Sequence, residues 1–279
     1  MMQIEYSERT KLSEMNGSNE PGLRASSEAA SSEIETSEVL AEVERRMEAR
    51  RSAGRAEARA AILADRFVYW FSKRWLAVFN AFFLLYVGLP ILAPVLMVVG
   101  TEWPATIIYT MYRPLCHQLP QRSFFLFGPQ LTYTASELME RVGINIGLGP
   151  TTRAFVGTEA IGYKVALCQR DTAIYGTIFL FGLVYGLLRR RWKVPSLPLW
   201  AYIGFGVVPM LLDGGYQFLS YVMPLIWPDG PIVPHETAPA MRVITGALFG
   251  LATAWLAYPI VNETMEEARK SLERRFGWE

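Results

Sequence analysis

Long apolar runs alternate with polar connections along this chain, and the alternation predicts four transmembrane helices. The runs cover about 75–100, 171–188, 197–227 and 240–261. A helix crosses the roughly 30 Å hydrocarbon core of a bilayer with about 17 to 25 mainly apolar residues, and every run reaches that length. Pro90 and Pro94 are expected to kink the first helix. The expected fold class is therefore all-α, a polytopic membrane protein whose residues 75–261 form a bundle of four transmembrane helices.

The segment before the first run is polar and divides into two parts. Residues 1–33 are rich in Ser, Glu, Asn and Gly, so they are predicted to form a disordered tail. Residues 34–74 are predicted to form a soluble charged helix that becomes amphipathic and interfacial, because the stretch from Asp65 to Arg74 mixes aromatic with cationic residues. This helix can rest on anionic lipid or dock a protein partner. Residues 262–279 are predicted to form a charged cytoplasmic tail.

The first two runs are joined by a long connection, residues 101–170. Its segment 106–112 is apolar but too short to cross a bilayer, so it is expected to be interfacial or re-entrant. Gly147 and Gly149 precede Pro150, and a flexible loop is expected there because no lysine follows at the position that a phosphate-binding loop requires.

Glycine spacing favours close packing of two of the helices. Gly182 and Gly186 are four residues apart in the second run, and Gly246 and Gly250 are four apart in the fourth. Helices in lipid associate without a hydrophobic drive, and small residues at this spacing let their backbones approach. We therefore expect these faces to lie at helix contacts.

The basic residues indicate one orientation in the membrane. They cluster before the first run, between the second and third runs, and after the fourth run. Cytoplasmic loops carry an excess of Lys and Arg, so both termini are predicted to be cytoplasmic in a multi-pass protein of the plasma membrane, with 101–170 and 228–239 outside. A net charge of +1 gives no electrostatic reason to expect nucleic acid as a partner, and the expected surroundings are the lipid bilayer.

This topology brings the scattered polar residues to one level at the outer boundary of the membrane. Charged groups at membrane depth are costly, face the protein interior and usually mark function. Asp213 is expected to pair with Arg242 from the neighbouring helix, an ion pair that can serve a function or simply join two helices. The predicted polar intramembrane site comprises Asp213, Gln217, Arg242, Arg170 and Arg122.

Cysteine and histidine are rare, with two residues of each type in the chain. Two cysteines exclude a disulfide-dense scaffold and a four-cysteine zinc module. Thiolate, imidazole and carboxylate groups are nevertheless the ligands that zinc and related transition metals prefer. The candidate metal ligands are Cys116, His117, Cys168 and Asp171, with Asp213 as an alternative to Asp171. Neighbouring Cys116 and His117 can share one ion only if the proline-flanked turn redirects their side chains.

Three motifs occur in a fixed order along the chain. They are Cys116-His117-Gln118 with Pro120, Arg122, Ser123 and Phe124, then Cys168-Gln169-Arg170-Asp171-Thr172 with Tyr175, then Asp213, Gly214 and Gln217 followed by Arg242, Thr245 and Gly246. Over about 75–260 they resemble an uncharacterised family of predicted prokaryotic membrane proteins, a domain of unknown function. Many members of that family have a further cysteine where this chain has Asp171, and a shorter stretch between the first two motifs. The resemblance implies that these residues belong together, and it implies no established activity.

The residues leave several functions open, and they do not decide whether the protein is an enzyme. The outer-face site can hold a transition metal such as zinc or support thiol-redox or quinone-linked chemistry. Alternatively, the chain is a non-catalytic assembly subunit in which a disulfide joins Cys116 to Cys168. A small-solute transporter would need to act as an oligomer, because four spans without an internal repeat are few. His235 and Glu236 lie in the proline-rich outer connection, where a lone histidine is expected to be solvated.

Overall fold

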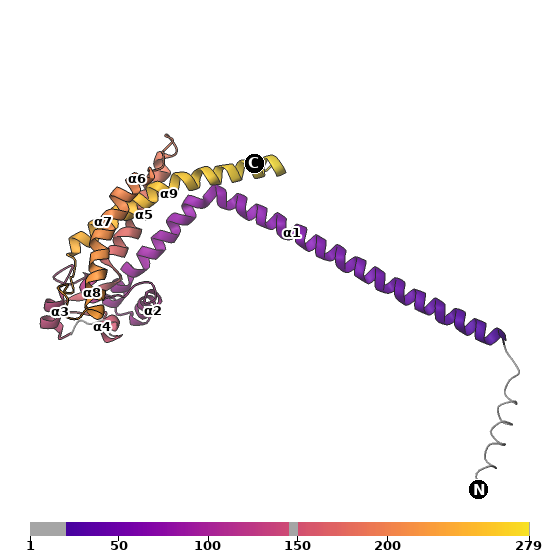
Figure 1. The fold of residues 1–279 in the computed structure, drawn as a ribbon, viewed down its shortest axis with the longest axis horizontal. Helices are drawn as coiled ribbons and strands as arrows, with labels where there is room; N and C mark the ends of the chain where they lie inside the picture. Colours follow the sequence, from indigo (N-terminus) through magenta and orange to yellow (C-terminus); the bar gives the residue numbers. More distant parts are fainter. Residues whose placement is uncertain (1–20, 145–149, 279) are drawn as a thin grey trace, which may run out of the picture. The chain divides into compact units, whose positions relative to one another are not determined.

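The computed structural model describes residues 21–144 and 150–278, in two units divided after Arg66. The described part of the first unit is helical and belongs to α1 (Pro21–Val98), which continues into the second unit (Figure 1). Residues 21–33 are part of this helix, whereas the sequence predicted disorder there; alanine and glutamate, which recur in this stretch, are good helix formers. The remainder of the predicted tail, residues 1–20, lies outside the described residues, as do Gly147 and Gly149.

Among the residues that the structure describes, three helices are long and apolar enough to cross a membrane. They are α1 over its part from Leu40 to Val98, α5 (Gln169–Leu188) and α9 (Pro239–Phe276). They correspond to the first, second and fourth apolar runs. Helix α9 continues beyond its apolar run, so most of the predicted charged tail is helical.

The third predicted span is helical but interrupted. Short α-helices α6 (Leu199–Ala201) and α7 (Val208–Met210) and the longer α8 (Tyr216–Ile226) alternate with two π-helical turns, η2 (Tyr202–Val207) and η3 (Leu211–Gly215). Pro209, which has no backbone N–H to donate, lies between the π-helical turns. Of the four predicted spans, three are continuous helices of membrane length in the described residues, and the third is a helical segment with interruptions. Turns of this kind are frequent at functional sites, and η3 carries Asp213.

The membrane-length helices pack through aromatic and glycine contacts. The ring of Tyr258 in α9 meets Trp75 of α1 at 5.7 Å between centroids and Tyr185 of α5 at 5.9 Å. A Cβ atom on Gly250 would lie 2.3 Å from the carbonyl oxygen of Ile174, so only glycine allows this approach of α9 to α5. Close packing at the paired glycines of α9 is therefore confirmed.

A small sheet in the long connection corrects the all-α prediction. Strands β1 (Ser123–Leu126), β2 (Gly157–Thr158) and β3 (Gly162–Cys168) are antiparallel in the order β1-β3-β2. The pairing of Ser123 with Cys168 joins segments that are far apart in the sequence. A short apolar run such as β3 cannot be distinguished from helix by periodicity alone, which is why the sheet was missed.

Short helices surround this sheet. They are α2 (Glu102–Tyr112), the 3₁₀ turn η1 (Pro120–Arg122), α3 (Ala135–Val142) and α4 (Pro150–Ala154). Helix α2 has 11 residues, too few to span a bilayer. Its buried face packs with Val165 and Leu167 of β3 in one apolar core, and Cys116 belongs to the same core.

Candidate functional site

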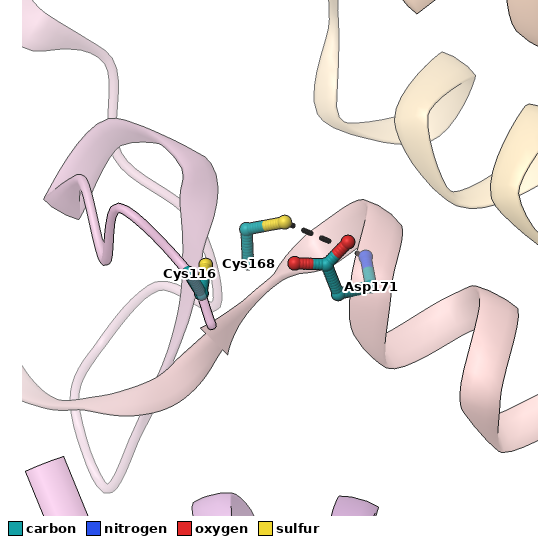
Figure 2. Close-up of side chains that lie close together, drawn as sticks. All are labelled: Cys116, Cys168 and Asp171. Atoms are coloured by element: carbon teal, nitrogen blue, oxygen red, sulfur yellow. Dashed lines mark hydrogen bonds between the residues drawn. The ribbon is translucent and has the colours of Figure 1, made fainter. Parts of the chain in front are cut away.

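Two cysteines from distant segments meet where β3 ends. Cys116 follows α2 and is buried, and Cys168 is the N-cap of α5. The Cys168 sulfur accepts a hydrogen bond from the backbone N–H of Asp171 at 3.4 Å, drawn as the dashed line in Figure 2. Sheet pairing places the first motif beside the second, since Ser123 is opposite Cys168. The structure therefore joins two of the sequence motifs at one point.

Two thiols and a carboxylate lie close enough to bind one ion together. One ligand atom from each of Cys116, Cys168 and Asp171 lies within 4.8 Å of the other two. Both cysteines are free thiols. The hydrogen bond from the Cys168 thiol lowers the pKa of Cys116, although burial opposes that shift. The same hydrogen bond, together with burial, raises the pKa of Cys168. Cys116 is thus the thiol of the pair that more readily becomes a thiolate.

His117 lies outside this group of three. Its side chain is exposed, while its backbone carbonyl accepts a hydrogen bond from Arg153 Nε at 3.2 Å. The next residue, Gln118, has a positive φ of 51°, which turns the chain sharply after the Cys-His pair. The side-chain amide of Gln118 then donates to the carbonyl of Tyr109 at 2.8 Å. The imidazole of His117 is therefore not among the clustered ligand atoms, although His117 lines the same cavity as Cys116.

Asp213 pairs with Arg170, which corrects the predicted pairing with Arg242. Arg170 Nη2 lies 2.5 Å from Asp213 Oδ2, and the hydroxyl of Thr245 donates to the same oxygen at 2.9 Å. Gly214 leaves room for this contact, because a Cβ there would lie 2.9 Å from Arg170 Nη1. Asp213 lies in the π-helical turn η3, where side chains point in other directions than in the regular α-helix that periodicity predicts. Asp213 thus joins the second and third motifs.

Glu236 is the central acidic residue of the site, and sequence reasoning missed that role. Its carboxylate forms a 2.6 Å ion pair with Arg122 Nη2 and a second ion pair with Arg242. It also accepts hydrogen bonds from Gln217 Nε2 at 2.7 Å and from the hydroxyl of Tyr221 at 2.6 Å. The adjacent His235 is exposed, as predicted, and its ring packs on Tyr216. The available signal was an excess of charge in the predicted polar site, which has three arginines and one aspartate, next to a connection that carries Glu236.

Arg242 ties the three motifs together from a buried position. Besides Glu236, its guanidinium donates to the carbonyl of Gln121 and to Gln169 Oε1, each at 3.2 Å. Gln169 Nε2 in turn donates to the carbonyl of Ser123 at 3.0 Å. The first motif, the second motif and α9 are therefore linked by one network.

Lys164 is a second residue that the sequence analysis did not single out. It lies in β3 with no exposed surface, and its ammonium donates to the carbonyls of Gln118 at 2.6 Å and Arg153 at 3.1 Å. Burial lowers its pKa to about 7, while the charge of Cys116 opposes that shift. A lone lysine inside an otherwise apolar run was the signal in the sequence. Its bonds fix the turn that follows Cys116.

The cysteine pair and the three arginines line a common cavity of about 300 Å³. The predicted site residues that line it are Cys116, His117, Cys168, Asp171, Arg122, Arg170, Gln217 and Arg242. Asp213 contacts it indirectly through Arg170. The chemistry available in one place is therefore a thiol pair, a nearby carboxylate and three guanidinium groups held by carboxylates.

Comparison with known proteins agrees with a membrane protein of unknown function. The model of the family described as Predicted membrane protein (DUF2085) matches residues 158–256, which contain the second and third motifs. The chain is 24% identical over 198 residues to an uncharacterized protein of Methanocaldococcus jannaschii, an alignment that covers 68% of this chain and 94% of that protein. No solved structure matches the chain. The similarity to uncharacterised predicted membrane proteins is therefore confirmed, and it assigns no activity.

Proposed function

We propose that this integral membrane protein holds a transition metal, with zinc as the best fit, in its outer connection. The observation that carries the proposal is the approach of ligand atoms from Cys116, Cys168 and Asp171 to within 4.8 Å of one another. Zinc–sulfur bonds of about 2.3 Å in tetrahedral geometry separate neighbouring ligands by about 3.8 Å, so small side-chain movements would close the site. Both thiols would bind as thiolates.

The surroundings support three protein ligands and an open fourth position. Asp213 is bound by Arg170 and Thr245, so it is not available as the fourth ligand. A water or another molecule that enters the cavity can complete the coordination. Three protein ligands and an exchangeable position are typical of zinc sites that act on a substrate rather than only stabilise a fold.

Metal analysis of the purified full chain tests this function. We expect about one zinc per chain after purification in mild detergent, and loss of most of it in Cys116→Ser, Cys168→Ser and Asp171→Asn. Asp229→Asn, in the exposed outer connection, is the matched control and should keep its metal. Zinc that is absent from the wild type, or retained in both cysteine variants, would refute the metal site.

The thiol pair also favours a second candidate, a structural or redox-active disulfide. The two sulfur atoms are neighbours, although both thiols are free in the structure. This alternative predicts thiols that resist alkylation until a reductant is added, in protein without stoichiometric metal. It would place the chain among non-catalytic assembly subunits or thiol-redox proteins.

The membrane topology is part of the proposal. We place four crossings in the chain, with the interrupted segment 199–226 as the third. The distribution of Lys and Arg then puts both termini in the cytoplasm and the cavity outside. A Glu140→Cys substitution in a chain with Cys116→Ser and Cys168→Ser should react with an impermeant maleimide added to intact cells. Protection from the reagent would show that the orientation is the opposite of the one proposed.

The charged first part of α1 is proposed as the docking segment for a protein partner. Its apolar residues Leu40, Val43 and Met47 are exposed, and Glu42 is paired with Arg46 at 2.8 Å. Deleting residues 1–64 should remove any partner that co-purifies with the full chain. Unchanged co-purification would end this part of the proposal.

A further inference from the structure

A basic pocket lies at the other end of α5 from the cysteine site. It has a volume of about 430 Å³ and is formed where α5 ends beside α9. Arg189, Arg190, Arg191 and Lys193 line it from the segment after α5, and Glu263 and Glu266 line it from α9. The local charge at neutral pH is therefore positive, since four basic side chains face two carboxylates.

The height of the pocket relative to a bilayer follows from the length of α5. That helix has 20 residues and is about 30 Å long at 1.5 Å per residue, which matches the hydrocarbon thickness. Arg189 comes directly after its last residue, Leu188. The basic side chains are thus placed where the hydrocarbon ends and lipid phosphates begin. Trp192, with 64% of its surface exposed, is at the same level, as is common for tryptophan at membrane interfaces.

The contacts inside the pocket leave two guanidinium groups without a partner. Arg189 donates to Asn262 Oδ1 at 2.8 Å and lies over the ring of Trp75. Lys193 faces Glu263 at 3.5 Å, and Glu266 accepts a hydrogen bond from Asn262 at 3.1 Å. Within residues 21–144 and 150–278, neither Arg190 nor Arg191 takes part in an ion pair or a side-chain hydrogen bond. The acidic residues of the pocket are therefore already engaged, and these two arginines are not.

We propose that this pocket binds the head group of an anionic phospholipid, with Arg190 and Arg191 on its phosphate. Guanidinium groups bind phosphate oxygens in a bidentate manner, and basic pockets between membrane helices are suited to anionic head groups. Arg189, fixed by Asn262 and Trp75, forms the wall of the pocket. This surface is separate from the cysteine site, and lipid binding there does not require the metal.

Lipid retention by the full chain tests this inference. Delipidated protein in detergent is mixed with phosphatidylglycerol or phosphatidylcholine of the same acyl chains, and bound lipid is counted by native mass spectrometry. The wild type should retain phosphatidylglycerol selectively. Replacing both arginines (Arg190→Gln, Arg191→Gln) should weaken that binding about 30-fold, because each basic residue contributes about 1 kcal/mol and 1.4 kcal/mol corresponds to tenfold.

Two matched variants and one competitor separate the outcomes. Arg274→Gln with Arg275→Gln removes the same charge from the end of α9 and should leave binding within about twofold. Arg190→Lys with Arg191→Lys should keep most of the selectivity, which shows that a loss in the glutamine pair is not a folding defect. Three results would overturn the assignment to a lipid head group: equal retention of both lipids, an equal loss of binding in the α9 control, or displacement of the lipid by millimolar inorganic phosphate.

Discussion

Removing the carboxylate of Glu236 should destabilise the protein more than any other change in the connection 228–239. The side chain of Arg242 is only 4% exposed and relies on Glu236 as its acidic partner, while Glu236 itself is 31% exposed. Breaking a buried ion pair by removing one partner costs about 3–5 kcal/mol, since the other charge is left in a poor solvent. Water can partly replace a partner that is one-third exposed, so we expect about 2–3 kcal/mol for Glu236→Ala.

The assay is thermal unfolding of detergent-purified protein, followed by tryptophan fluorescence. For a unit of 150–250 residues each kcal/mol shifts the midpoint by about 2–4 °C, so Glu236→Ala should unfold about 4–12 °C below the wild type. Asp229→Asn removes an acidic charge from the same connection at an exposed position and should change the midpoint by less than about 2 °C. A Glu236→Ala midpoint as close to the wild type as that of Asp229→Asn would refute the reasoning.

A double variant identifies the cause of the loss. If the cost comes from an uncompensated Arg242, then adding Arg242→Met to Glu236→Ala should cost less than the sum of the single changes, by about 1–3 kcal/mol. Strict additivity would show that the two groups do not stabilise each other. Recovery will be incomplete, because Arg242 also donates to Gln121 and Gln169.

The same residue predicts a dependence on pH. Burial raises the pKa of Glu236, but the hydrogen bonds from Arg122 and Tyr221 and the charges of Arg122 and Arg242 outweigh burial, so the pKa lies below its usual 4.5. A lowered pKa in the folded state means that the stabilisation is complete above the unfolded value and is lost as the pH falls through the folded one. Wild-type stability should therefore fall more steeply below about pH 4.5 than that of Glu236→Gln.

Three further predictions test other parts of the structure. Gly250→Leu should lower the unfolding midpoint strongly, because the new Cβ alone would lie 2.3 Å from backbone and hydroxyl oxygens of α5. A Cβ at Gly54 meets no atom within 4 Å, so Gly54→Leu should have little effect, and similar midpoints for the two variants would contradict the packing. Wild-type stability should rise between about pH 7 and 10.5, since Lys164 holds fewer protons when the protein is folded than when it is unfolded. Lys164→Met should show a smaller rise in urea titrations, and the same dependence of stability on pH in both proteins would argue against a buried ammonium. Cys168→Ala should slow alkylation of Cys116 by iodoacetamide at pH 7–8, because the hydrogen-bond donor that favours the Cys116 thiolate is lost. Cys168→Ser keeps a donor and should slow the reaction less, so equal rates in the two variants would contradict the role of Cys168 as that donor.

The long-range pairing of the first two motifs was beyond the sequence. Periodicity and length identify apolar helices because a helix satisfies its own backbone groups, and α1, α5 and α9 were predicted for that reason. The pairing of Ser123 with Cys168 depends on partners far apart in the chain, and no local pattern marks it. The structure brings Cys116, Cys168 and Asp171 together, and metal binding by them stays a prediction. The predicted fourth ligand, His117, is exposed and lies outside this group.

The sequence by itself identified a membrane protein with several helices that could cross a bilayer, because the cost of burying charge in lipid keeps such helices nearly free of charged residues. The resemblance to a family of predicted membrane proteins implied that the three motifs belong together. Only the tertiary structure decided the partners within that group. Arg170 forms an ion pair with Asp213, and Arg242 forms one with Glu236. The position of Asp213 depends on a π-helical turn, and that of Glu236 depends on the fold of the connection 228–239.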